Sequence, residues 1–385
     1  MRVLAVILVW AALAVQAHAG EQVRLGYLAL QDDPRFDPRF AYARVPTRPQ
    51  GDTLAAVQMA VSDMKILTDA RKMEVLLDAS RVLAEDLETE AERMAADGVN
   101  HIVLDLPADD VARVAESVQQ TTMLLNATAP EDWLRHRCYP HLLHIAASDR
   151  IMADALVQHM VRQKWRSVLV LHGKTERDRV RADAFTLAAK RFRLEIIDTR
   201  TFDLSTNPAM REENNAMLLT GGAGDYDAVF IADEHGEYAR YLPFRTALPR
   251  PVVGAAGLVP LEWHWALERY GAPQVNLRFE RLSERRMGWQ DWSAWVAAKA
   301  VLTAFAKTRD ATPEKVDAFL RSDRLRLDGS KGTPMSFRSW SGQLRMPILL
   351  TTQNAVIDIA PLEGFLHHEN TLDSLGQDEP EFGCE

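Results

Sequence analysis

The sequence predicts an α/β protein built from two doubly wound lobes, each with a parallel sheet. From Val23 onward, short apolar runs alternate with segments of helical periodicity, which is typical of consecutive βα units. The chain has 385 residues, 47% of them apolar and 26% charged, so it is long enough for two or three domains with their own cores. This composition argues against fibrous, repetitive and multispanning membrane proteins.

The N-terminal residues predict export. Arg2 precedes an apolar run from Val3 to Val15, and Ala17-His18-Ala19 fits the small-x-small rule of signal peptidase sites. We therefore interpret residues 1–19 as a cleavable signal peptide, with a mature chain that begins near Gly20. The alternative, an uncleaved anchor, would need about twenty apolar residues.

Two cysteines, Cys138 and Cys384, are expected to be oxidised in an exported protein. We interpret them as one disulfide, which would close a loop of about 246 residues. Two free thiols remain the alternative, because sequence does not supply the geometry that a disulfide needs.

The first series of elements ends near Asn126. We expect strands at residues 23–28, 75–77, 101–104 and 123–126, and helices at 53–67, 80–96 and 109–119. The segment Gln31–Arg39 separates the first strand from the first helix. Its prolines and paired aspartates predict a polar loop.

The second series predicts the second lobe. We expect helices at residues 148–164, 177–191 and 209–219, and strands at 167–171, 194–197 and 228–231. Apolar residues spaced three and four apart then indicate a long amphipathic helix over residues 289–307. Short strands are expected at 335–337 and 344–350. Residues 363–385 are acidic and aperiodic, and we interpret them as a surface strap.

The sequence carries no recognisable catalytic or nucleic-acid signal. Gly173-Lys174-Thr175 has Val168 where a P-loop needs its first glycine, and neither a dinucleotide-binding glycine motif nor a nucleophile elbow is present. A formal net charge of −9 disfavours nucleic acid as a partner. We therefore expect a protein that is not an enzyme and has no cofactor of its own.

Candidate metal ligands do not form a known pattern. His141 and His144 would point to opposite faces of a strand, and the cluster at His367-His368-Glu369 matches no zinc spacing. The aspartates of the loop at residues 32–37 lack the spacing of a calcium site. We assign no metal site, although a cation site formed by Asp32, Asp33 and Glu234 remains an alternative.

Two segments carry a family resemblance. The run from Leu124 to Glu131 (LLNATAPE) and His172-Gly173-Lys174 resemble segments of the leucine/isoleucine/valine-binding branch of type I periplasmic binding proteins. The resemblance implies two lobes that the chain connects three times, near Ile145, Phe279 and Arg338. Lobe I would comprise residues 20–145 and 280–338, and lobe II residues 146–279 and 339–362.

The resemblance also implies a function. A member of this family is a periplasmic solute receptor whose lobes close over a ligand and which an ABC-type permease of the inner membrane then recognises. This chain has Ala256 where amino-acid receptors carry a glutamate for the ligand's ammonium group, and Glu234 where they carry a tyrosine. Leu106-Pro107-Ala108-Asp109 replaces their serine-rich turn. These differences imply poor binding of α-amino acids.

A narrower resemblance concerns the segments Asp32–Arg39, Asp233–Tyr238 and Gly257–Pro260 with Trp263. They look like receptor-like proteins that accompany alcohol oxidation dependent on pyrroloquinoline quinone (PQQ). The implied ligand is PQQ, an alcohol-derived acid, or a lanthanide or calcium species. A metal-binding or accessory protein of a quinoprotein dehydrogenase is the alternative, and a periplasmic hydrolase a weaker one.

We expect the solute to be anionic and planar or aromatic. Trp263 would stack on its ring, arginines would bind its carboxylates, and backbone N–H groups at helix starts near Ala108 and Thr128 would add to the anion site. The expected ligand-binding residues are Tyr27, Arg35, Arg39, Ala108, Asp109, Asn126, Thr128, Thr175, Arg177, Glu234, Ala256 and Trp263. Alternatively, the arginines pair with Asp32, Asp33, Asp37 and Asp178, and Trp263 belongs to the core.

Overall fold

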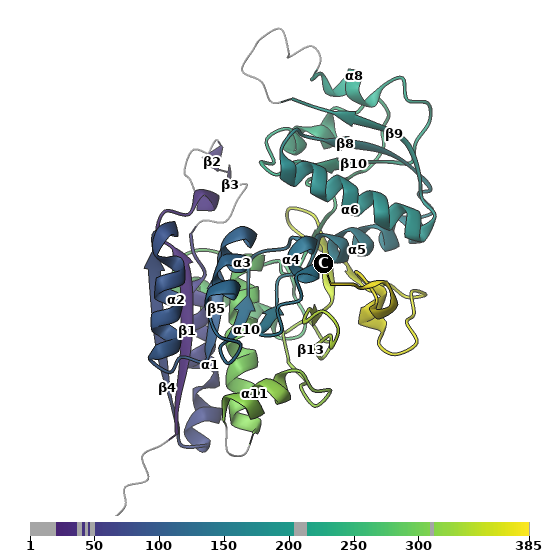
Figure 1. Ribbon diagram of the computed structural model, residues 1–385. Helices are drawn as coiled ribbons and strands as arrows, with labels where there is room; N and C mark the ends of the chain where they lie inside the picture. The colour runs from purple at the N-terminus through teal and green to yellow at the C-terminus, as the bar shows by residue number, and fades with distance from the viewer. Residues whose placement is uncertain are drawn as a thin grey trace, which may run out of the picture.

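The computed structural model describes residues 21–36, 41–42, 45–46, 51–203, 214–308 and 312–384. The expected signal peptide, Arg39 and residues 209–213 of one expected helix lie outside this part of the chain. None of the helices within it combines the length and the apolar character that a membrane span requires. Figure 1 shows two α/β lobes, one above the other, and a small third sheet beside their junction.

Lobe I contains a five-stranded parallel sheet, as the alternation of strands and helices predicts. Its strands, in spatial order, are β4 (Met73–Val82), β1 (Glu21–Leu30), β5 (His101–Asp105), β6 (Met123–Asn126) and β7 (Leu142–His144). Along the chain β4 and then β5 follow β1 in this sheet, and they lie on opposite sides of it. The carboxyl ends of β1 and β5 therefore form a topological switch point, where ligands bind in sheets of this type.

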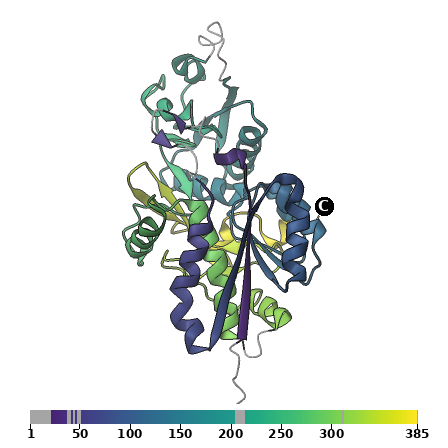
Figure 2. The same cartoon turned by 90° about the vertical axis from the view of Figure 1, so that its left-hand side faces the viewer.

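Helices cover both faces of this sheet, as Figure 2 shows. Alternate residues of β1 point to opposite sides: Leu25 and Tyr27 belong to one core, whereas Leu28 and Leu30 belong to another. The first core includes α1 (Leu54–Ala70), α9 (Ala272–Ser283), α10 (Trp289–Lys307) and α11 (Pro313–Leu320), and the second includes α2 (Leu87–Ala96) and α3 (Ala108–Ser117). Smaller elements of this half are η1 (Pro34–Phe36), β2 (Ala41–Tyr42), β3 (Val45–Pro46), η3 (Ala84–Asp86) and α4 (Asp132–His136).

Lobe II contains a second parallel sheet, with the spatial order β11 (Val252–Gly254), β10 (Ala228–Ala232), β8 (Ser167–His172) and β9 (Glu195–Thr201). Its helical elements are α5 (Asp149–Arg162), α6 (Glu176–Phe192), α8 (Ala216–Thr220) and η4 (Ala239–Phe244). The strand order reverses between β8 and β10, so the second switch point lies at their carboxyl ends. The two α/β lobes predicted from the sequence are thus present.

Three segments connect the lobes. The first follows β7, the second runs from β12 (Val259–Leu261) to α9, and the third leads from β14 (Leu344–Arg345) to β15 (Ile348–Thr351). The strands β12, β15 and β16 (Val356–Ala360) form the small antiparallel sheet. β14 pairs with β13 (Ser336–Phe337) and lies next to lobe I, because Gln343 bridges His144 of β7.

Two of the expected lobe boundaries fall within continuous structure. The boundary at residue 279 lies inside α9, which packs on α1 of lobe I, and Arg278 of this helix donates a hydrogen bond to Asp63 (3.0 Å). The boundary at residue 338 lies inside the β13–β14 hairpin. In the structure the chain therefore leaves lobe II before residue 272 and leaves lobe I after residue 345.

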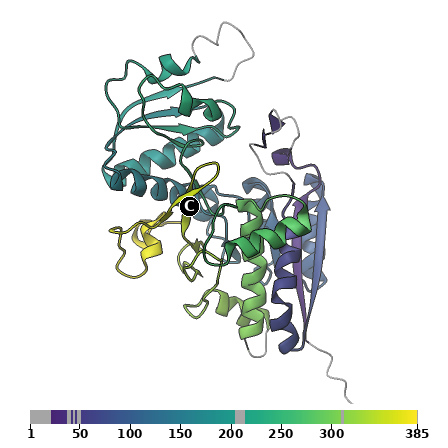
Figure 3. The same ribbon diagram turned by 180° about the vertical axis from the view of Figure 1, so that it is seen from behind.

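Three local expectations are wrong. Residues 80–82 continue β4 instead of starting a helix, since they pair with β1. The strand expected at 344–350 is divided at Met346-Pro347 into β14 and β15, as the missing N–H of proline favours. The C-terminal segment is not only a surface strap: it contains η5 (Thr371–Ser374) and η6 (Glu379–Glu381), and Leu372–Leu375 are buried. Figure 3 shows this segment beside the junction of the lobes.

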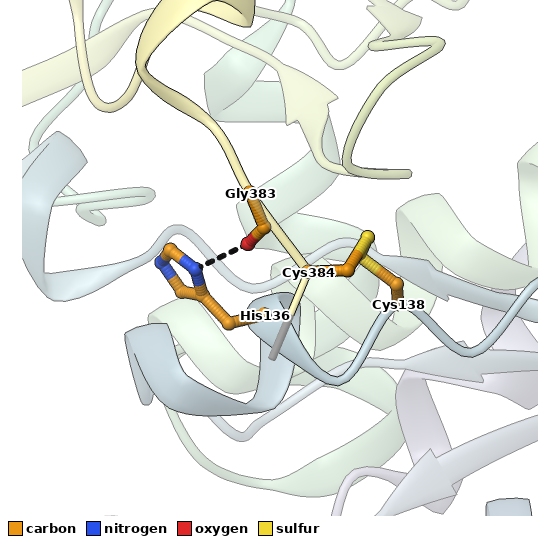
Figure 4. Close-up of a disulfide and its surroundings, with 4 residues drawn as sticks. All are labelled: His136, Cys138, Gly383 and Cys384. Atoms are coloured by element: carbon orange, nitrogen blue, oxygen red, sulfur yellow. Dashed lines mark hydrogen bonds between the residues drawn. A yellow bond between two sulfur atoms is a disulfide. The ribbon is translucent and has the colours of Figure 1, made fainter.

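The expected disulfide is confirmed. Cys138 and Cys384 are joined, with their Cα atoms 5.6 Å apart, and the bond ties the end of the C-terminal segment to the turn after α4. Nδ1 of His136 donates a hydrogen bond to the carbonyl oxygen of Gly383 (2.8 Å) beside the bridge, as Figure 4 shows.

Candidate functional site

A cavity of about 310 Å³ lies where the lobes meet. Lobe II supplies most of its lining, from α5, α6, β12 and the carboxyl ends of β10 and β11. The other side supplies Pro130 and the first two residues of α10, Trp289 and Gln290. This is the crevice at the carboxyl ends of parallel strands in which α/β proteins bind ligands.

One arginine of the cavity is already neutralised. The two terminal nitrogens of Arg177 donate to the two carboxylate oxygens of Asp149 (2.5 and 2.7 Å), and Glu131 lies 3.6 Å from its Nε. Burial opposes the charge, but Asp149 and Glu131 raise the pKa of Arg177 overall. Thr175 places this arginine, because it caps α6 in a capping box with Asp178.

A second arginine, Arg181, lies one turn further along α6 and also lines the cavity. Its side chain is 38% exposed, and its closest carboxylate oxygen is that of Asp149, 4.0 Å from Nε. Burial and the neighbouring charge of Arg177 lower the pKa of Arg181. Among the described residues, none accepts a hydrogen bond from Arg181, so this cation is available to a ligand.

Two acidic groups follow β10. The carboxylate of Asp233 is buried and accepts hydrogen bonds from backbone N–H groups of the following turn, those of residues 235, 236, 238 and 239. Glu234 lines the cavity, and its own N–H donates to Asp178 (2.6 Å). Within the described part of the chain, no group donates a hydrogen bond to the Glu234 carboxylate. A ligand could therefore place a hydrogen-bond donor there.

The three connections between the lobes meet at a buried acid and a buried base. Glu262 lines the cavity, and its Oε1 accepts a hydrogen bond from the N–H of Ala147 in the first connection (3.0 Å). Nζ of Lys331 donates to the carbonyl oxygens of Glu262 (3.0 Å) and Pro347 (2.6 Å), in the second and third connections. It also lies 3.8 Å from the centre of the Trp292 ring. Burial raises the pKa of Glu262 to about 7.

The switch point of lobe I holds a second polar cluster, centred on Asp105 at the end of β5. Asp105 accepts hydrogen bonds from Tyr27 (3.1 Å), Thr53 (2.9 Å) and Arg35 (2.9 Å). Arg35 also donates to Asp33 and to the hydroxyl of Thr128. The structure therefore brings Tyr27, Arg35 and Thr128 together, but the donors of Arg35 are engaged within lobe I.

The other expected residues have varied environments. Asn126 is buried and donates to the carbonyl of Ala129 (2.8 Å) and contacts His144. Ala108 begins α3 as expected, with Asp109 exposed after it, but no helix begins at Thr128, where the chain forms a bend. Ala256 is half-buried and does not line the cavity.

Trp263 belongs to the core. Its side chain is 1% exposed, its indole N–H donates to Asn276 (2.9 Å), and its ring stacks on Trp292 with centres 6.1 Å apart. The aromatic residues that line the cavity are Trp289 and Phe230 instead. Of the expected ligand-binding residues, Arg177 and Glu234 line the cavity.

Sequence reasoning missed Arg181, Asp149, Glu262 and Trp289. One signal was present: Arg181 follows Arg177 by four residues, so both lie on one face of the helix. Among the described residues, no group of three metal-ligating side chains forms a metal site. Asp33 is bonded to Arg35, while Glu234 belongs to the other lobe.

No protein-family model matches the chain, and no curated protein matches its sequence. Solved structures do match its fold. A periplasmic binding protein from Burkholderia mallei has a TM-score of 0.67 at 13% identity, over 94% of this chain and 98% of that one. A branched chain amino acid ABC transporter periplasmic ligand-binding protein from Burkholderia xenovorans has a TM-score of 0.70 at 15% identity, over 88% and 94% of the two chains.

A branched-chain amino acid transporter substrate binding protein from Streptococcus pneumoniae, solved with isoleucine, has a TM-score of 0.63 at 13% identity, over 88% of this chain and 99% of that one. These similar proteins are binding proteins, not enzymes. The chain therefore has the two-lobed α/β fold of type I periplasmic binding proteins, as the sequence predicts.

Proposed function

We propose that this protein is the periplasmic solute-binding component of an ABC-type importer. The observation that carries the proposal is the cavity at the junction of the lobes, which both lobes line and into which Arg181 and Glu234 bring charged groups without close partners among the described residues. A solute that contacts both lobes would favour a closed arrangement over an open one. An inner-membrane permease would be the partner that recognises the closed form.

We also propose, from the sequence resemblance, that the importer serves PQQ-dependent alcohol oxidation. An alcohol-derived acid suits the cavity better than PQQ itself, which carries three carboxylates. Among the described lining residues, Arg181 is the cation without a carboxylate within 3.5 Å, and Arg177 already holds Asp149. A quinoprotein dehydrogenase would then supply or consume related compounds.

A second candidate ligand is a branched-chain amino acid. It is favoured by the carboxylates of Glu234 and Glu262 in the cavity, which could hold an ammonium group. Our main proposal expects no such binding, because the sequence resemblance places Ala256, which does not itself line the cavity, where amino-acid receptors carry their glutamate. Calorimetry with leucine separates the two, since micromolar affinity would favour the amino acid.

The proposal is tested by native mass spectrometry of protein purified from its own periplasm, followed by small-angle scattering. An organic acid released on denaturation, which restores a more compact particle when added back, is the expected result. A stoichiometric metal would favour the metal-binding or accessory function. A particle that holds no solute and keeps its dimensions with every solute tested would contradict the proposal.

A further inference from the structure

We propose that Arg181 and Trp289, which come from opposite lobes, make the cavity selective for an aromatic compound with a single carboxylate. The carboxylate would bind Arg181, and the ring would lie against Trp289. This inference rests on the proposed function, because it names the solute class of the same cavity. These two residues differ from those that the sequence suggested for the same roles, which were Arg35, Arg39 and Arg177 for the carboxylates and Trp263 for the ring.

The position of Arg181 supports the carboxylate site. Its guanidinium is partly withdrawn from water at the wall of the cavity, and Asp149 is 4.0 Å away and already bonded to Arg177. Burial and the neighbouring Arg177 disfavour the charge of Arg181, and the carboxylates of Asp149, Glu234 and Asp178 favour it without accepting a hydrogen bond from it in the described part of the chain. A ligand carboxylate could accept two parallel hydrogen bonds from this guanidinium.

The charges around Arg181 limit the ligand to one carboxylate. Asp149 and Arg177 cancel each other, and Asp233 is held by backbone N–H groups. Glu234 adds negative charge to the wall, and Glu262, whose pKa burial raises to about 7, adds a further acid. A second carboxylate on the ligand would meet these acids rather than a cation, which costs energy in a partly desolvated site. A hydroxyl or another neutral donor could instead bond to Glu234.

The aromatic part follows from Trp289 and Phe230. Trp289 is the first residue of α10, so its half-buried ring is presented at the end of the helix that faces lobe II. Phe230, in the middle of β10, contributes a second ring to the lining and is itself stacked on Phe185 with centres 3.8 Å apart. A flat ring between these two surfaces would bury apolar area against both lobes.

Titration calorimetry with four small probes tests this inference. Benzoate, benzyl alcohol and benzylamine share one ring but differ in charge, and phthalate adds a second carboxylate. We expect benzoate to bind the wild-type protein about tenfold more tightly than the other three. Arg181→Gln should weaken the binding of benzoate by about tenfold and change the binding of benzyl alcohol little, because the lost interaction is with the carboxylate.

Trp289→Leu should weaken the binding of benzoate and of benzyl alcohol by similar factors, because the aromatic ring of each probe would contact Trp289. Two matched variants serve as controls. Arg179→Gln removes an exposed arginine of the same helix, bonded to Glu176, and Trp265→Leu removes a tryptophan outside the cavity lining. Both should bind benzoate like the wild type.

Several results would overturn the inference: benzoate binding that survives Arg181→Gln, stronger binding of benzylamine or phthalate, or no binding of any probe. If scattering still shows compaction with another solute, the proposed function stands and only this ligand class fails. If no solute compacts the protein and no probe binds, the proposed function fails with it.

Discussion

Nζ of Lys331 lies 3.0 Å from the carbonyl oxygen of Glu262, and both side chains are buried between the lobes. The same nitrogen bonds to Pro347, and the Glu262 carboxylate bonds to Ala147. One lysine and one glutamate therefore join the three connections on which any movement of the lobes depends. Their ionisation should affect how firmly these connections are held.

The first prediction concerns pH. Burial raises the pKa of Glu262 from its ordinary value of 4.5 to about 7, so the folded protein holds this proton more tightly than the unfolded chain does. The resulting stability is fully present below about pH 4.5 and is lost as the pH rises through about 7. Glu262→Gln cannot ionise, so its Tm should fall less between pH 5 and pH 8 than the wild-type Tm, by a few degrees.

Thermal denaturation across this pH range measures the difference. The exposed Glu280→Gln, in α9, is the control and should follow the wild-type curve. Parallel curves for wild type and Glu262→Gln would contradict the assignment of this acid.

The second prediction concerns the C-terminal segment. Asp373 is fully buried and accepts hydrogen bonds from Nε of Arg338 (2.8 Å) and Nε of Arg345 (2.9 Å). Asp373→Asn would leave two buried guanidinium groups without their carboxylate and should lower the free energy of unfolding by about 3–5 kcal/mol. Urea denaturation measures this loss, and the exposed Glu379→Gln should change it by less than about 0.5 kcal/mol. A loss below about 1 kcal/mol for Asp373→Asn would refute the prediction.

The third prediction concerns the lobe I cluster. If Arg35 acts mainly through Asp105, then Arg35→Met and Asp105→Asn should not be additive, with a coupling of about 1 kcal/mol or more in a double-mutant cycle. The exposed pair Arg93 and Asp78, 3.0 Å apart, provides the control cycle and should couple by less than about 0.5 kcal/mol. Additive losses at Arg35 and Asp105 would instead leave Arg35 free for the ligand role that the sequence suggested.

The fourth prediction concerns the disulfide. Replacing Cys138 and Cys384 by serine should lower the free energy of unfolding by about 2–5 kcal/mol, because the open chain gains conformational freedom when unfolded. Urea denaturation of the oxidised protein and of the double variant gives the difference. The wild-type protein under reducing conditions should match the double variant, and equal stability of all three samples would show that the bridge contributes nothing.

The sequence predicted the architecture better than the site. The strand at residues 123–126 and the helix at 289–307 have the expected bounds, because continuous apolar runs and helical periodicity are local properties of the chain. The pairing of Arg177 with Asp149 is different, since it depends on how α5 and α6 pack. Sequence could name the arginine as a candidate, but not the carboxylate that neutralises it.

Two aromatic residues show the same limit. Trp263 follows a strand and Trp289 begins a helix, and the sequence predicted a ligand contact at Trp263 but not at Trp289. Only the packing of Trp263 on Trp292 and its bond to Asn276 identify it as core. Whether a side chain is buried depends on which distant segments pack over it, and the spacing of residues along the chain does not predict that packing.

The bridge between Cys138 and Cys384 makes most of the chain a covalent ring, with a sequence separation of 246 residues between its two cysteines. The whole of lobe II lies within this ring. A single proteolytic cut anywhere in that lobe therefore releases no fragment, and the two pieces migrate together on a gel until the disulfide is reduced. In a compartment that contains proteases, a nicked molecule would keep both halves of its cavity on one covalently connected particle.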